Sequence, residues 1–199
     1  FCVTIPHKVA ISKLCNELMP SAKQIGAVNV VFFDNKRRLI GENFDGKGFV
    51  SGLKVEGHAI KNKKVFISGA GGAARAIAFE LVKEGIDLLT LSNRTEQKAI
   101  DLSISIKKWF PETKIFISNE PKKHDVLINT TSLGLNKNDP LPFLLDNLLC
   151  DSLVVDIIME PSITKLLYQA KEKGLKIHQG KHMLDYQVEL MEKFLTKNL

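Results

Sequence analysis

Residues 65–77 read Val65-Phe66-Ile67-Ser68-Gly69-Ala70-Gly71-Gly72-Ala73-Ala74-Arg75-Ala76-Ile77 and combine three patterns in a row. A short apolar run, typical of a β-strand, ends at a cluster of glycines. A helical pattern follows, in which apolar residues recur every three to four positions and form one buried face, made by Ala74, Ile77, Ala78, Leu81 and Val82. Gly85 stands after the last turn, where a helix C-cap is expected.

The glycine turn between this strand and this helix is typical of a dinucleotide site. Its spacing, Gly-x-Gly-Gly-x-Ala over residues 69–74, is a variant of the usual Gly-x-Gly-x-x-Gly. Glycines let a pyrophosphate approach the backbone, and the free N–H groups and positive end of the helix hold it. The cofactor-binding residues predicted here are Gly69, Ala70, Gly71, Gly72 and Ala73. A glycine-rich turn without a ligand is the alternative.

The end of the next predicted strand, residues 87–91, indicates which dinucleotide is bound. NAD enzymes usually place an acidic residue there to bind the ribose 2′-hydroxyl. This chain has Asn93, Arg94 and Thr95 instead, with Lys98 one turn later. A guanidinium binds a 2′-phosphate through a fork of hydrogen bonds, whereas a carboxylate would repel it. We therefore predict NADP as the cofactor, although the same residues can also form a turn and cap the next helix.

Composition narrows the possible partners. The chain has 199 residues, 44% of them apolar, and a formal charge of +6. Its lysines form no basic stripe interleaved with aromatic residues, so nucleic acid is not expected, and a mild positive field suits an anionic cofactor and an acidic substrate. No apolar run approaches a membrane span and no signal peptide is visible, so we expect a cytoplasmic protein that binds no membrane. A monomer and a homodimer both remain open.

Cysteines and histidines give no sign of a metal site or of a disulfide framework. The three cysteines, Cys2, Cys15 and Cys150, have neither metal-ligand nor disulfide spacing, which favours a reducing compartment. The histidines have no mutual metal spacing and are expected at the surface or in packing: His7, His58, His124, His178 and His182.

The second half of the chain alternates apolar runs with helical patterns. Strands are predicted at residues 64–68, 87–91, 114–117, 125–129, 152–157 and 175–177, and helices at 73–84, 95–109 and 163–173. This order indicates an α/β fold with a Rossmann-type doubly wound parallel sheet. Trp109 and Phe110 end a helix and are expected in the core. Residues 181–199 predict an amphipathic helix that could return to the first part of the chain.

The first part of the chain predicts a smaller unit. We expect a strand over residues 1–5, a helix that has Pro6 in its first turn and continues over 8–18, and a hairpin of 30–33 with 39–40. A glycine-rich loop and a helix over 47–53 follow. The polar stretch 56–64 is the expected domain boundary.

Several blocks together resemble the shikimate dehydrogenase family. They occur in the family's order and at about its spacing, and they cover nearly the whole chain. The blocks are Val3-Thr4-Ile5-Pro6-His7-Lys8, Gly26-Ala27-Val28-Asn29, Asn43-Phe44-Asp45, Gly69-Ala70-Gly71-Gly72-Ala73-Ala74, Asn93-Arg94-Thr95, Asn129-Thr130-Thr131 with Gly134, Pro161 with Thr164, and Gly180 with Met183, Leu184 and Gln187.

The resemblance implies a fold and an activity. The family reduces 3-dehydroshikimate to shikimate with NADPH, in the route to chorismate and aromatic amino acids. By this resemblance, residues 1–57 and the returning helix 183–199 are part of an α/β substrate domain, and residues 58–182 form the NADP domain. The chain would begin inside the substrate domain, so we expect little activity from these 199 residues alone.

The resemblance also implies roles for single residues. Thr4, Asn29 and Gln187 would bind the hydroxyls of a polyhydroxylated cyclic acid, while Thr130, Ile157 and Gly180 would line the cofactor site. Two of them have plainer alternatives: Asn29 could cap the hairpin strand, and Gln187 could be a solvated helix residue. Thr130 stands at the C-terminal end of a strand, which is the edge where doubly wound sheets bind ligands.

Lys8 and Asp45 are the candidates for proton transfer. Carbonyl reduction needs a hydride on carbon and a proton on oxygen, and a lysine can supply the proton. Lys8 lies in the first turn of a predicted helix, whose positive end disfavours an ammonium. A nearby Asp45 would favour the ammonium, so the two would act as a coupled pair. A solvated surface lysine and an aspartate that only forms a turn are the alternatives.

Three positions depart from the family pattern. Cys2, Phe44 and Met159 stand where the family usually has polar side chains, and all three lie on the substrate side. The alternatives are therefore a quinate-type or divergent relative and a non-catalytic NADP-binding regulatory protein.

Overall fold

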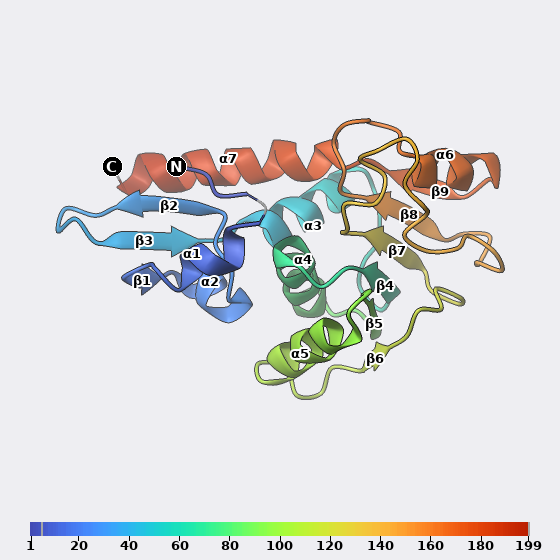
Figure 1. The fold of residues 1–199 in the computed structure, drawn as a ribbon, viewed down its shortest axis with the longest axis horizontal. Helices are drawn as coiled ribbons and strands as arrows, with labels where there is room; N and C mark the ends of the chain where they lie inside the picture. The colour runs from blue at the N-terminus through green and yellow to red at the C-terminus, as the bar shows by residue number, and fades with distance from the viewer. Residues whose placement is uncertain (5, 199) are drawn as a thin grey trace.

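The computed structural model of the chain describes residues 1–4 and 6–198, which fold into two lobes, each built on its own sheet (Figure 1). The smaller lobe has a three-stranded sheet of order β1-β3-β2, and the larger has a six-stranded sheet of order β6-β5-β4-β7-β8-β9. Two long helices, α3 (Asp45–Val55) and α7 (Lys181–Asn198), pack against each other between the lobes and over the smaller one. No helix in the described ranges is both long and apolar enough to span a membrane.

The larger lobe confirms the predicted doubly wound sheet. All neighbouring strands in it are parallel. The strands are β4 (Lys64–Ser68), β5 (Leu88–Ser92), β6 (Ile115–Ile117), β7 (Val126–Asn129), β8 (Leu153–Asp156) and β9 (Lys176–His178). The chain moves outward from β4 to β6 and then returns to β7, which lies on the other side of β4, and ligands bind at such a reversal in open α/β sheets.

Side chains of the parallel strands alternate between two cores, one on each face. Val65 and Ile67 face a core shared with α4 (Gly72–Lys83) and α5 (Glu96–Lys107). Phe66 faces the opposite core, which it shares with α6 (Lys165–Glu172). The expected buried face of α4 is confirmed, with Val82 only partly buried, and Gly85 follows it at a left-handed φ of 80°.

Trp109 is not a core residue, which corrects the prediction. Helix α5 ends at Lys107, two residues earlier than expected, and the Trp109 side chain is 51% exposed. Phe110 alone turns inward and packs against the core beside Phe79. Because the helix ends just before these two residues, Trp109 lies in solvent while Phe110 packs in the core.

The smaller lobe confirms the hairpin and corrects what precedes it. Strands β2 (Val30–Phe33) and β3 (Leu39–Glu42) pair antiparallel as predicted. The strand expected over residues 1–5 is reduced to a single bridge between Cys2 and Val30, and Ile5 lies outside the described residues.

The long helix predicted over residues 8–18 is wrong. Helix α1 (Lys8–Ser12) is short, β1 (Glu17–Leu18) pairs with β3, and a separate α2 (Pro20–Ile25) follows with Pro20 in its first turn. The Asn16 side chain accepts a hydrogen bond from the backbone N–H of Leu39 at 2.7 Å. The pairing of β1 with β3, which is distant in sequence, therefore outweighs the local helical spacing of residues 8–18.

Helix α7 is the amphipathic helix predicted at the end of the chain, and glycines let it approach α3 closely. A Cβ on Gly48 would lie 2.6 Å from the Cβ of Gln187, and one on Gly52 would lie 3.1 Å from His182. Further along α7, the ring of Phe194 meets that of Phe44 at a centroid distance of 5.3 Å. Phe44, where the family usually has a polar residue, is therefore part of the packing that holds α7 on the smaller lobe.

Candidate active site

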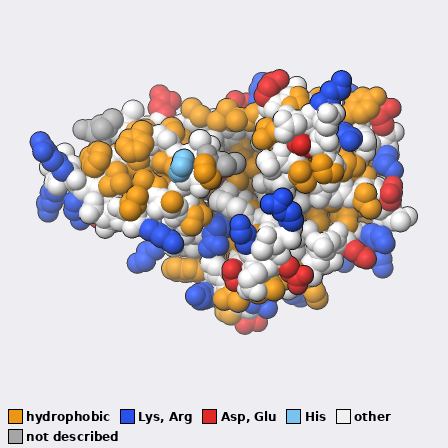
Figure 2. Space-filling view, in the orientation of Figure 1, with side chains coloured by type: hydrophobic (Ala, Val, Ile, Leu, Met, Phe, Trp, Pro, Cys, Tyr) orange, Lys and Arg blue, Asp and Glu red, His pale blue; other side chains and the backbone are white. Residues whose placement is uncertain are grey.

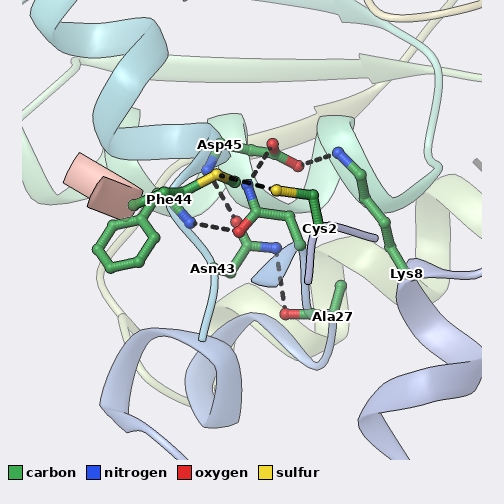
Figure 3. A network of polar contacts seen from close by, with 8 residues as sticks. Cys2, Lys8, Ala27, Asn43, Phe44 and Asp45 are labelled. Carbon is green, nitrogen blue, oxygen red and sulfur yellow. Dashed lines mark hydrogen bonds and ion pairs between the residues drawn. The ribbon is translucent and has the colours of Figure 1, made fainter. Parts of the chain in front are cut away.

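Lys8 and Asp45 meet, as the sequence predicts for a proton-transfer pair. The Lys8 ammonium nitrogen lies 2.5 Å from Oδ2 of Asp45 (Figure 3). The side chains are 13% and 1% exposed, so this ion pair is largely shielded from water. Lys8 begins α1 and Asp45 begins α3, and two helix starts therefore place the pair.

The pair lies beside the glycine turn of the larger lobe. A Cβ on Gly72, the first residue of α4, would stand 3.1 Å from the Cβ of Lys8. The backbone at Gly46 approaches the carbonyl oxygen of Ala76 so closely that a Cβ there would collide with it. The start of α3 is thus docked on α4, and Lys8 of the ion pair lies against Gly72 of the predicted cofactor turn.

The glycine turn has the shape that a pyrophosphate needs. Gly69 has a φ of 113°, a conformation that favours glycine, and a Cβ there would collide with Thr130 Oγ1. Gly71 is exposed, and apart from its chain neighbours no atom of the described residues lies within 4 Å of where its Cβ would be. It is the N-cap of α4 and makes no side-chain cap, so the first N–H groups of the helix remain for a ligand.

The strand ends beside this turn carry the other predicted cofactor residues. Thr130 donates a hydrogen bond from its hydroxyl to the carbonyl oxygen of Ser68 at 2.6 Å, which ties the ends of β7 and β4 together. Ile157 follows β8 and Gly180 follows β9. A Cβ on Gly180 would lie 2.5 Å from the Ile157 carbonyl, so these two backbones are in direct contact.

The residues predicted to select NADP lie at the end of β5. Asn93 donates from its side-chain amide to the carbonyl oxygen of Thr95 at 2.8 Å and so shapes the turn. Arg94 and Thr95 are exposed, and Thr95 is the N-cap of α5 without a side-chain cap bond. Arg94 thus extends from an ordered turn at the carboxyl edge of the sheet. Figure 2 shows Lys and Arg side chains near the middle of the face between the lobes.

The residues predicted to bind substrate differ in their surroundings. Thr4 is exposed, ahead of Lys8. Gln187 lies on α7, and its buried Oε1 has no hydrogen-bond partner among the described residues. A buried amide oxygen without a partner costs free energy unless a ligand donates to it. Asn29 is buried and its amide contacts the turn that carries Asp45.

A second buried carboxylate, Asp156, organises the carboxyl edge of β7 and β8. It accepts hydrogen bonds from the Asn129 amide, the Ile158 backbone N–H and the Thr164 hydroxyl, at 3.1, 3.1 and 2.8 Å. Burial raises the pKa of Asp156, and these hydrogen bonds oppose the rise. These contacts indicate a structural role for Asp156.

Sequence reasoning missed two groupings because their members are far apart in the chain. Arg75 of α4 donates to the Ile25 carbonyl oxygen at 2.9 Å and to Ser105 Oγ at 3.1 Å, and its burial lowers its pKa. It thereby joins α2 of the smaller lobe to the larger lobe. The glycine-turn pattern contains Arg75, but nothing in the sequence indicates its partners.

The second grouping brings three histidines together where the chain crosses between the lobes. The ring of His178 lies 5.3 Å from that of His58 and 4.8 Å from that of His182. Burial, with its two neighbours, lowers the pKa of His178 to about 3, so it is neutral near pH 7. No group of metal-ligating side chains that could hold an ion is found among residues 1–4 and 6–198.

Fold and site together define a class. A doubly wound sheet with a glycine turn at its switch point, and a shielded Lys–Asp pair against that turn, are the parts of a dinucleotide-dependent oxidoreductase.

Comparison with known proteins gives the family. Residues 1–31 match the model of the shikimate dehydrogenase substrate binding domain. The shikimate dehydrogenase (NADP(+)) of Alkaliphilus oremlandii is 41% identical over 194 residues, which cover 92% of this chain and 68% of the relative. The chain belongs to the shikimate dehydrogenase family, which confirms the resemblance of its motifs.

Solved structures agree on the fold. Shikimate 5-dehydrogenase from Thermus thermophilus, in complex with NADP(H) and shikimate, has a TM-score of 0.87 at 32% identity and covers all of this chain and 73% of its own. A 5-ketofructose reductase of a Gluconobacter strain has a TM-score of 0.81 at 38% identity, with 94% of this chain and 69% of that chain covered.

Proposed function

We propose that this protein interconverts 3-dehydroshikimate and shikimate with NADP as its cofactor, in the route to aromatic amino acids. The observation that carries the proposal is the shielded Lys8–Asp45 pair beside Gly72 of the glycine turn. The family supports it, because the relative from Alkaliphilus is a shikimate dehydrogenase that uses NADP(+).

The residues of the larger lobe fit a dinucleotide with a 2′-phosphate. The turn of Gly69 and Gly71 would hold the pyrophosphate, and Arg94 with Asn93 and Thr95 would hold the phosphate on the ribose. Ala70, Gly72 and Ala73 complete the turn, while Thr130, Ile157 and Gly180 would line the nicotinamide end. When bound, the cofactor supplies or accepts the hydride.

Lys8 moves the proton. In the direction of reduction, the Lys8 ammonium donates a proton to the carbonyl oxygen of the substrate, which becomes a hydroxyl. In the direction of oxidation, the neutral amine of Lys8 takes the hydroxyl proton back. Asp45, 2.5 Å away, aims the ammonium and stabilises its charge in a shielded position.

The smaller lobe would bind the substrate. Gln187 offers a buried oxygen without a protein partner, which suits a hydroxyl donor, and Thr4 and Asn29 would supply further contacts. We propose that residues 1–57 with 183–199 belong to a substrate domain and 58–182 to the cofactor domain. The close approach of α7 to α3, which positions Gln187 near the start of α3, supports this division.

A related ketone is the second candidate substrate. Met159 is 47% exposed on the loop after β8, and Cys2 is exposed in the smaller lobe, so apolar side chains are available where the family usually has polar ones. The similarity to a 5-ketofructose reductase shows that this fold also serves another polyhydroxylated ketone. Quinate and its keto form belong to the same chemical group.

Turnover decides between these candidates. The protein at its natural length is mixed with NADP and shikimate or quinate, or with NADPH and their keto forms or 5-ketofructose, and absorbance of the reduced nicotinamide is followed. We expect the highest kcat/KM with shikimate and its keto form, and loss of turnover in Lys8→Met. NADP binding without turnover on any of these compounds would instead indicate a non-catalytic regulatory protein.

A further inference from the structure

Asp45 is held from three sides, and two of the three groups that hold it take no part in the proposed proton transfer. Its Oδ2 faces Lys8, its Oδ1 accepts a hydrogen bond from the Asn29 amide at 2.7 Å, and its backbone N–H donates to Asn43 Oδ1 at 3.0 Å. Figure 3 shows Asn43 linking this turn to Ala27. The carboxylate is therefore fixed in position and in rotation about its own bond.

The amide of Asn29 contacts two points of that turn at once. Its Nδ2 donates to Asp45, and its Oδ1 accepts from the backbone N–H of Phe44 at 3.0 Å. A side-chain amide carries a donor and an acceptor side by side, whereas an ionised aspartate offers only acceptors and a leucine offers neither.

Asn29 is itself well anchored. It is 1% exposed, its backbone N–H donates to Glu42 at 3.0 Å, and its carbonyl oxygen accepts from Val3 at 2.8 Å. A side chain on so constrained a backbone has little freedom to turn toward solvent. Because the Asn29 backbone is anchored beside strands β2 and β3, these strands fix the place where its amide meets the Asp45 carboxylate.

We propose that Asn29 is a positioning residue that acts on Lys8 through Asp45. By occupying Oδ1 and holding the turn at Phe44, it keeps Oδ2 directed at the Lys8 ammonium. This inference deepens the proposed function and rests on it for its catalytic meaning. It assigns Asn29 a task in the protein without ligand, distinct from the predicted contact with a substrate hydroxyl.

The test measures how fast an amine-specific acylating reagent labels Lys8 in the ligand-free protein at one fixed pH, with exposed Lys107 as the internal reference. Four proteins are compared: wild type, Asn29→Ala, Asp45→Ala and the double variant. Loss of the Lys8–Asp45 pair in Asp45→Ala should speed labelling roughly tenfold, a factor equivalent to about 1.4 kcal/mol. Asn29→Ala should speed it at least threefold in the wild-type background, because the released carboxylate no longer faces the ammonium.

The double variant separates positioning from other roles. Residues that act as one unit are not additive, so Asn29→Ala should change nothing further in the Asp45→Ala background. Ser152→Ala, which removes a buried hydrogen bond to the His124 carbonyl in the larger lobe, should label Lys8 as wild type does.

Two results would overturn the proposal: labelling of Asn29→Ala at the wild-type rate, or the same acceleration with and without Asp45. Melting temperature and NADP affinity check that each variant is folded, and Asn29→Ser replaces Asn29→Ala if the latter is not. Because labelling needs neither substrate nor turnover, it fails or succeeds separately from the assay with shikimate.

Discussion

The buried histidine between the lobes should make the stability of this protein depend on pH in a way that one substitution removes. His178 is 3% exposed, and its Nε2 has no hydrogen-bond partner among the described residues. Burial, then the neighbouring His182 and His58, lower its pKa from 6.5 to about 3. Glu56 and Lys176 are the other charged groups near this cluster.

The direction in which stability changes with pH follows from the two pKa values of His178, in the folded and in the unfolded chain. Above pH 6.5 the imidazole is neutral in both the folded and the unfolded chain, so it makes no difference to stability. As the pH falls below 6.5, the imidazole binds a proton in the unfolded chain but not in the folded chain. The free energy of unfolding therefore decreases as the pH falls, down to about pH 3. At pH 5 the pH is 1.5 units below the pKa of the imidazole in the unfolded chain. Protonation of the unfolded chain therefore lowers the free energy of unfolding by about 2 kcal/mol relative to pH 8.

His178→Phe keeps a ring of similar size and removes the titration. We expect urea unfolding, followed by circular dichroism at pH 8 and pH 5, to show a loss about 2 kcal/mol larger in wild type than in the variant. Ser152→Ala, which changes no titratable group, should follow the wild-type pH dependence at lower overall stability. Parallel losses in wild type and His178→Phe would refute the reasoning, and His178→Asn provides the same comparison if the larger ring is not accepted.

Four other outcomes are expected. Arg94→Ala should weaken NADP by about one to two orders of magnitude and leave NAD nearly unchanged, by calorimetry at one ionic strength, because a charge-assisted hydrogen bond contributes roughly 1.5–3 kcal/mol. Asn93→Asp should move the measured ratio of the two dissociation constants further toward NAD. Lys8→Met should abolish turnover while the NADP dissociation constant stays within about twofold, since the role proposed for this side chain is proton transfer. Gly180→Ala should cost about 1–3 kcal/mol in urea unfolding, because its Cβ would lie 2.5 Å from the Ile157 carbonyl.

The larger lobe could be predicted closely because its strands are short apolar runs separated by amphipathic helices. Both faces of a parallel sheet are covered, so such strands are apolar throughout, and each predicted strand end lies within one residue of the structure. The smaller lobe is different. Its β1 consists of two residues, Glu17 and Leu18, and exists only because β3 lies beside it, so no local pattern could reveal it.

The sequence nominates the residues of the candidate site one by one, but it does not give their assembly. The pattern around Lys8, Asp45 and the glycine turn predicts the chemistry through a family resemblance, yet it does not give the distances. Asn29 shows the limit: its residue type suits both a substrate hydroxyl and a neighbouring carboxylate, and only the fold brings it to 2.7 Å from Asp45.

Glycines explain how the two lobes form one site. The start of α3 can carry Asp45 to the cofactor turn only because Gly46 lets its backbone touch that of Ala76 on α4. Gly72 in turn leaves room for the stem of Lys8, which would otherwise be within 3.1 Å of a new Cβ. The glycine pattern that predicts a pyrophosphate site thus has a second task in this protein. It sets the distance between the Lys8–Asp45 pair and the glycine turn, and under the proposed function that distance determines whether Lys8 and the cofactor can both reach the substrate carbonyl.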